Sequence, residues 1–144
     1  MQFSSRLLKP SMFCLLLLPS VMAAEVPSLK VVVTGMEPLT GTVELTLFDS
    51  EETFMKEPRL QQKGVPDENG EFSWDLVVLP KGQYALVAVH DANDNGQLDR
   101  GFLGFGGESY GFSNNVSSWF GWPDFSDAAV TVDSTGMELL IQLD

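Results

Sequence analysis

The chain has 144 residues, of which 20 are acidic and only eight are lysine or arginine, so its formal net charge is −12. So acidic a chain repels nucleic acid and anionic lipid, which argues against nucleic-acid binding and favours cations or basic partners. One histidine and one cysteine are too few for a zinc site built from several such side chains. An acidic surface also serves solubility alone, so the charge does not by itself define a partner.

The first 24 residues have the pattern of a secretory signal peptide. Arg6 and Lys9 give a basic start, a short apolar run follows, and small residues stand at the expected cleavage point. We therefore expect a periplasmic or secreted protein in which residues 25–144 form one domain with no membrane-inserted segment. Removing Arg6 and Lys9 leaves six basic and twenty acidic residues, a net charge of −14. The single cysteine leaves with the signal peptide, so no disulfide is expected.

Short apolar stretches separated by turn residues predict a series of β-strands. In chain order, strands are expected at residues 29–33, 43–48, 71–79, 83–90, 128–133 and 137–143. The fourth of these strands is apolar on both faces, which predicts a central position in its sheet. Asp49 and Glu52 have capping-box spacing, so a helix of at most two turns is expected before Pro58. The polar residues 53–69 are expected to form a loop.

This series of strands, with almost no helix between them, predicts an all-β fold, a single β-sandwich of about seven strands. One long irregular insertion interrupts it at residues 91–126, which are rich in glycine, asparagine, serine and aromatic residues. An insertion of this length is uncommon in a compact domain unless it has its own ligand, function or packing. The functional chemistry is therefore expected in the insertion.

The stretch HDANDNGQLD, residues 90–99, has the spacing of a calcium-binding loop. Alternate positions carry oxygen ligands, and Gly96 allows the sharp turn that aims them inward. The expected calcium ligands are Asp91, Asn93, Asn95, the backbone carbonyl of Gln97, Asp99 and Glu108. Glu108 would supply the bidentate carboxylate, because Phe102 occupies the place where a calcium hand has its last glutamate. A ligand set made only of oxygen favours calcium over zinc.

Other interpretations of this loop stay open. Asparagine and aspartate side chains bond their own backbone in turns that hold no metal, and Asn-Gly is a strong turn signal. His90 could be a ligand, a general base or a structural hydrogen-bonding residue at the end of its strand. The place of Glu108 decides between the two readings of the loop. A Glu108 carboxylate within coordination reach of Asp91, Asn93 and Asp99 favours the metal site, and one that points away favours the turn.

No residue set defines a reaction, so a calcium-stabilised binding or structural module is expected rather than an enzyme. One alternative is a hydrolase acting on an extracellular polymer through His90, an insertion serine such as Ser113, or acidic residues of the expected ligand set. Another alternative is a sugar- or peptide-binding module that uses the insertion aromatics Trp119 and Trp122. The expected partners are thus a divalent cation and an unidentified protein or glycan.

Three stretches in this order resemble a known family. They are LPKGQYALVAVHDANDNGQLD, LGFGGESYGFSNN and PDFSDAAVTV, which begin at Leu79, Leu103 and Pro123. Together they resemble the bacterial domain-of-unknown-function family twenty-one forty-one, over roughly residues 29–143. The resemblance implies a small exported protein with an immunoglobulin-like or prealbumin-like sandwich, and it implies no activity. The turn at Leu79 also looks like that of carboxypeptidase-regulatory and adhesin-stalk sandwiches, which are mostly structural or binding modules.

Overall fold

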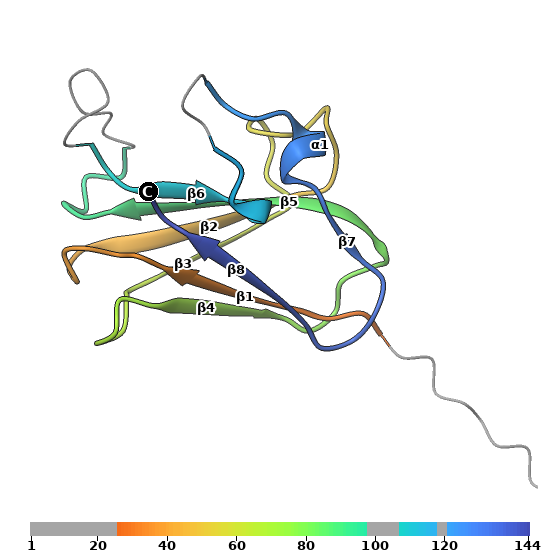
Figure 1. Ribbon diagram of the computed structural model, residues 1–144, viewed down its shortest axis with the longest axis horizontal. Coiled ribbons are helices and arrows are strands. Elements are labelled where there is room, and N and C mark those ends of the chain that lie inside the picture. The colour runs from red at the N-terminus through yellow and green to blue at the C-terminus, as the bar shows by residue number, and fades with distance from the viewer. Residues whose placement is uncertain (1–25, 98–106, 118–120) are drawn as a thin grey trace, which may run out of the picture.

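Figure 1 shows a computed structural model of the chain, which describes residues 26–97, 107–117 and 121–144. Its strands form two sheets. The first sheet has the order β4 (Phe72–Leu76), β1 (Leu29–Thr34), β8 (Met137–Gln142). The second sheet has the order β3 (Leu60–Gly64), β2 (Thr42–Phe48), β5 (Gly82–Asp91), β6 (Tyr110–Phe112). Strand β7 (Val130–Val132) lies outside this order and pairs with the beginning of β5. A 3-10 turn η1 (Ser113–Asn115) follows β6, and a one-turn helix α1 (Phe125–Ala128) precedes β7.

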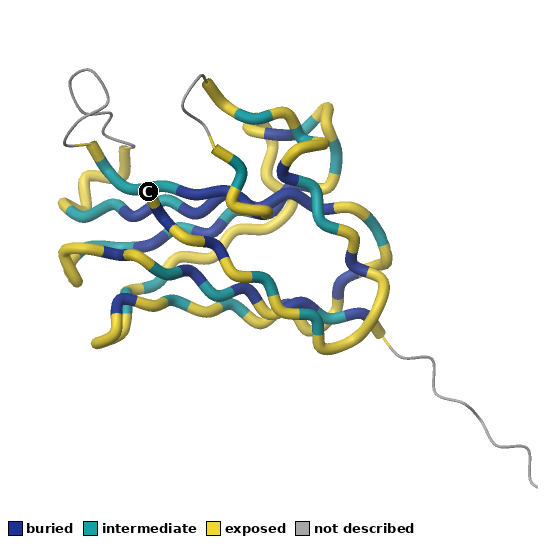
Figure 2. Tube along the Cα trace, in the orientation of Figure 1, coloured by how far each residue is buried: buried dark blue, intermediate teal, exposed yellow. Residues whose placement is uncertain are grey.

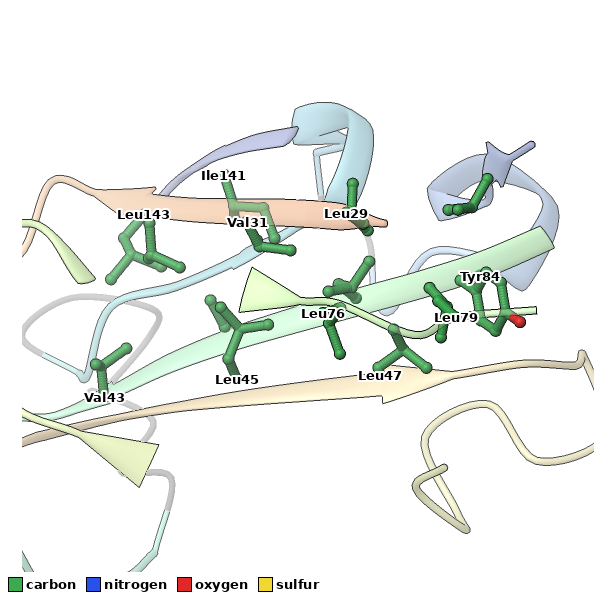
Figure 3. Close-up of a cluster of buried hydrophobic side chains, with 14 of the residues drawn as sticks. Leu29, Val31, Val43, Leu45, Leu47, Leu76, Leu79, Tyr84, Ile141 and Leu143 are labelled. Carbon is green, nitrogen blue, oxygen red and sulfur yellow. The ribbon is translucent and has the colours of Figure 1, made fainter. Parts of the chain in front are cut away.

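The main core lies between the two sheets, where alternate residues of β1 and β2 are buried (Figure 2) together with Tyr84, Leu86 and Ala88 of β5. Figure 3 shows Leu45 and Leu47 of β2 pointing toward the strand that carries Leu29 and Val31. Period-two alternation produces this pattern, because every second side chain of a strand faces the same side of its sheet. Tyr84 at the other end of β5 closes the core and donates its hydroxyl to Pro80 O at 2.8 Å.

A second apolar cluster covers the outer face of β5. Its buried members are Phe48, Phe54, Ala85, Val87, Phe112 and Ala128. They come from the sheet, from the turn that follows β2 and from α1, which lie together above this face in Figure 1. Strand β5 is therefore buried on both faces, as its apolar sequence predicts. The C-terminal end of β5 leads out of this packed region into the candidate site.

The all-β, two-sheet architecture confirms the predicted fold class, with eight strands among the described residues. The loop expected at residues 53–69 was wrong in part, because β3 occupies Leu60–Gly64 and pairs antiparallel with β2. The short helix expected before Pro58 was also wrong. Residues 51–56 form turns, and Met55 has a φ of 61°, which a right-handed helix does not allow. The insertion is less irregular than predicted, since it contributes β6, η1 and α1.

Among the described residues, no helix is long and apolar enough to cross a membrane.

Candidate metal centre

The loop that leaves β5 curls around the side chain of Asp91. Asp91 Oδ1 accepts the N–H of Asn95 at 3.1 Å, and Oδ2 accepts the N–H of Gly96 at 2.7 Å. Asn93 Oδ1 accepts the same Asn95 N–H at 3.0 Å, and Asn95 Oδ1 accepts the N–H of Gln97 at 2.8 Å. Gly96 has a φ of 73°, a left-handed conformation that glycine adopts without strain. An oxygen with two lone pairs can accept an N–H and coordinate a cation together, so these bonds are compatible with either reading of the loop.

The register of β5 against β6 places Glu108 directly across from Asp91. Val89 pairs with Tyr110, and the His90 N–H donates to Ser109 O at 2.9 Å, so the next pair in the antiparallel ladder is Asp91 with Glu108. The two carboxyl groups are within hydrogen-bonding reach of each other. Glu108 Oε1 is a buried atom, so this end of the side chain is shielded from solvent.

The pKa of Asp91 lies below its ordinary value. Desolvation raises this pKa, but the N–H groups of Gly96 and Asn95 and the hydrogen bond with Glu108 together outweigh it. Asp91 is therefore ionised at neutral pH. Two carboxyl groups in contact repel each other when both carry charge, so a proton or a cation has to offset the charge of the pair.

Strand β2 supports the base of the loop. Thr42, which pairs with Asp91 across the sheet, donates its hydroxyl to Asp94 Oδ1. Gly41 has a φ of 83°, and a Cβ built on it would lie 2.1 Å from Asp91 O, so only glycine lets the two chains approach this closely. His90 Nε2 lies 2.8 Å from Thr40 O, and since a carbonyl only accepts, this nitrogen carries the hydrogen.

The structure brings some of the predicted ligands together. Asp91 and Glu108 meet, and Asn93 and Asn95 form the loop around Asp91. Gln97 is the exposed last residue of the described loop, and Asp99 lies outside the described residues. Within the described part of the chain, no three acidic, histidine or cysteine side chains gather at one point. Two carboxylates with amide and backbone oxygens are therefore the donors that the described site offers.

Sequence reasoning missed the part that β2 plays in the site. The Thr-Gly-Thr run at residues 40–42 carries an ordinary turn signal, and nothing in it points to the Asp91 loop. The contact follows from the pairing of β2 with β5, which joins residues about fifty positions apart. The roles of Thr42 and Gly41 in supporting the Asp91 loop could be predicted only from that register.

The residues behind the hydrolase alternative have structural partners. His90 is 1% exposed and bonds Thr40 O, whereas Ser113 is fully buried, accepts the N–H of Leu86 at 2.9 Å and donates to Ala128 O. A hollow of about 710 Å³ lies elsewhere, and it is lined by Met36, Glu37, Pro38, Leu39, Glu68 and Asn69. The hydrolase alternative stays a prediction, and its residues do not line this hollow.

Aromatic residues of the insertion form a cluster around Trp122. The rings of Tyr110 and Phe112 lie 5.4 Å and 5.6 Å from the ring of Trp122, which is 39% exposed. Trp119 lies outside the described residues.

One protein-family model matches the part of the chain that contains the described candidate site. The family described as "Uncharacterized protein conserved in bacteria (DUF2141)" matches residues 31–139, which include the Asp91 loop, Glu108 and the turn at Ser113. The chain belongs to this family. The resemblance predicted from the sequence motifs is thereby confirmed, and the match covers most strands of both sheets in this DUF2141 member. No curated protein and no solved structure matches the chain significantly.

Proposed function

We propose that this DUF2141 protein is an exported β-sandwich protein that binds one calcium ion between the Asp91 loop and Glu108. The ion would stabilise the fold, and the protein would act as a binding or structural module outside the cytoplasm. Asp91, Asn93, Asn95, the carbonyl of Gln97, Asp99 and Glu108 are the proposed ligands. The apolar start of the sequence supports export to the periplasm or the medium.

The contact between the carboxyl groups of Asp91 and Glu108 is the observation that supports this proposal most strongly. An ordinary Asx-turn needs Asp91 and the two asparagines, but it does not require a second carboxylate from the segment that leads into β6. Glu108 meets Asp91 because it stands opposite in the β5–β6 ladder, and its Oε1 atom is buried. A bound cation would offset the charge of the two groups when both are ionised.

The chemistry of the donors favours calcium. Carboxylate, amide and backbone oxygens suit hard cations, and the flexible geometry of calcium accepts a loop of this kind. Magnesium demands a nearly ideal octahedron and gives up its water reluctantly, so it is the poorer match. With two carboxylates in the described site, the affinity should be that of extracellular calcium modules, with a Kd of about 0.1–1 mM.

Thermal unfolding with and without calcium tests the proposal. At a calcium concentration ten times the Kd, binding adds about 1.4 kcal/mol to the free energy of unfolding. For an exported chain of about 120 residues, that corresponds to a melting temperature about 5 °C higher than in EDTA. Magnesium at the same concentration should produce a smaller shift, because its geometry fits less well.

A pair of variants locates the effect. Glu108→Gln should abolish most of the calcium-dependent shift, because it removes one of the two carboxylates that meet in the site. Glu138→Gln makes the same change of charge on the other sheet. The Glu138 side chain is exposed, and its Oε2 atom forms a long surface ion pair with Lys30 Nζ at 3.9 Å. This control should keep the whole shift. Equal melting temperatures in calcium and in EDTA for the unsubstituted protein would reject calcium stabilisation.

The aromatic cluster supports a second candidate function, the binding of a sugar or peptide. Trp122 is partly exposed and its ring contacts the ring of Tyr110, the first residue of β6. Such a ring can stack on a sugar ring or an apolar peptide side chain. Quenching of tryptophan fluorescence by a panel of glycans and peptides, lost in Trp122→Ala, would support this candidate. A panel that leaves the fluorescence unchanged would count against it.

A further inference from the structure

The turn that follows β6 joins the two sheets. Asn115 Oδ1 accepts the N–H of Gln142 at 2.8 Å, and Asn115 Nδ2 donates to Leu140 O at 3.4 Å. Both partners belong to β8, which lies in the other sheet from β6. The chain end adds a third link, because the Asp144 N–H donates to Tyr110 O at 3.2 Å. We name this set of bonds the Asn115 bridge.

The same turn also fills a gap in the edge of β5. Strand β6 pairs with residues 87–89 of β5 and β7 pairs with residues 82–84, so the backbone of Leu86 lies between them. Ser113 Oγ accepts the Leu86 N–H at 2.9 Å and also donates to Ala128 O. The side chain of a buried serine thus replaces a missing strand partner, which a buried backbone N–H requires.

Close packing of the backbone holds β6 against β8. A Cβ built on Gly111 would lie 2.5 Å from Gln142 O, so a larger residue would push the strands apart. Asn115 itself has a φ of 48°, a left-handed conformation that asparagine tolerates better than most residues. The Gly-Phe-Ser-Asn-Asn run is therefore explained by contacts that fix where β6 lies.

The position of β6 matters for the candidate metal centre. Strand β6 is only three residues long and pairs with β5 through three residue pairs. A shift of the register by one residue would turn Glu108 to the opposite face of the sheet, away from Asp91. A strand of this length makes few hydrogen bonds with β5, and these few do little to fix its register. The contacts made by the turn after β6 therefore have to hold the register.

We propose that Asn115 and Ser113 are positioning residues for the cation site. They hold β6 in the one register that presents Glu108 to Asp91, and so they couple cation binding to the attachment of β6 to β8. This inference rests on the proposed function. Because coupling between two events is reciprocal, breaking the bridge weakens calcium binding, and removing calcium loosens the bridge.

The variant that tests this coupling is Asn115→Gly. Glycine accepts the left-handed backbone at this position, so the substitution removes the side-chain bonds without adding strain. Tyr84→Phe is the matched control, because it removes one side-chain hydrogen bond to a backbone carbonyl at the opposite end of β5. In calcium titrations, Asn115→Gly should weaken binding by about 5-fold or more, the usual scale of coupled sites, and Tyr84→Phe should leave the Kd unchanged.

Hydrogen exchange supplies a readout that does not need calcium. The His90 amide donates to Ser109 O in the β5–β6 ladder, so its exchange in EDTA reports whether β6 stays in place. Asn115→Gly should accelerate this exchange at least about tenfold relative to Tyr84→Phe, if the bridge carries the restraint. Faster exchange with an unchanged calcium Kd would overturn the coupling and leave the proposed function standing. An unsubstituted protein that binds no calcium would instead overturn the proposed function, and the coupling with it.

Discussion

Replacing Gly41 with alanine should damage the candidate site from the strand beneath it. Gly41 has a φ of 83°, and the added Cβ would lie 2.1 Å from Asp91 O and 2.7 Å from Ala92 Cα. Both are backbone atoms of the loop that carries the proposed ligands, so the loop itself has to move. We expect Gly41→Ala to lower both the stability of the protein and its affinity for calcium.

A second glycine separates the cost of the backbone conformation from the cost of the clash. Gly136 has a φ of 69°, and a Cβ built there meets no atom within 4 Å. Gly136→Ala should therefore cost only the left-handed conformation, about 1 kcal/mol. Gly41→Ala carries that cost and a clash with fixed backbone of about 1–3 kcal/mol, the usual range for overpacking.

Thermal unfolding in EDTA and calcium titration together measure the two effects. For a chain of this size the clash should lower the melting temperature of Gly41→Ala by at least about 4 °C relative to Gly136→Ala. The calcium Kd of Gly136→Ala should equal that of the unsubstituted protein, and that of Gly41→Ala should rise. Equal melting temperatures for the two variants, or equal calcium affinities, would refute the reasoning that Gly41 supports the Asp91 loop.

Two further predictions concern the fold and its dependence on pH. Ser113→Ala should lower the free energy of unfolding by about 1–3 kcal/mol, because it leaves the buried Leu86 N–H without its acceptor; denaturant titration measures this, and a neutral result would contradict the role of Ser113. The pKa of Asp91 is lowered in the folded protein, so its stabilising contribution is present above about pH 4, the ordinary aspartate pKa, and is lost as the pH falls through the folded pKa. Asp91→Asn in EDTA should therefore lose less stability than the unsubstituted protein between pH 5 and pH 3, and identical acid unfolding curves would count against this shift.

Much of the sandwich could be predicted because its strands alternate. Strands β1, β2 and β5 each present apolar residues at every second position to the main core, and β5 is apolar on both faces, so their places followed from the sequence. Strand β3 escaped prediction because its first four residues, Leu60–Lys63, are exposed and carry little apolar alternation. An edge strand of this kind exists because β2 offers it a partner, which is a tertiary effect.

The expected helix before Pro58 failed for a similar reason. Asp49 and Glu52 have suitable spacing for a helix cap, but Phe54 is buried against Phe48 and Phe125 in the outer cluster. Burial of the Phe54 ring outweighs the weak helix preference of these residues. Met55, directly after it, takes a left-handed conformation that ends any helix.

For the candidate site, the sequence points to the proposed donor residues but not to the segments that support them. The alternating oxygens of the Asp91 loop and the need for a distant carboxylate could be read from the spacing of the residues. Which segments hold them depends on two registers, β2 with β5 and β5 with β6, and a single sequence carries no direct signal for register. For the same reason the Gly-Phe-Ser-Asn-Asn run drew attention as a motif while its bonds to β8 stayed hidden.

Direct binding of calcium tests the central claim most closely. Equilibrium dialysis against about 1 mM calcium, the range in which extracellular modules bind, should find between about half an ion and one ion bound per chain, as a Kd of about 0.1–1 mM requires. Glu108→Gln should weaken this binding at least about tenfold, which corresponds to the loss of about 1.4 kcal/mol, and Glu138→Gln should not change it. A chain that retains no calcium, or one that binds it equally well after Glu108→Gln, would contradict a metal centre built from the Asp91 loop and Glu108.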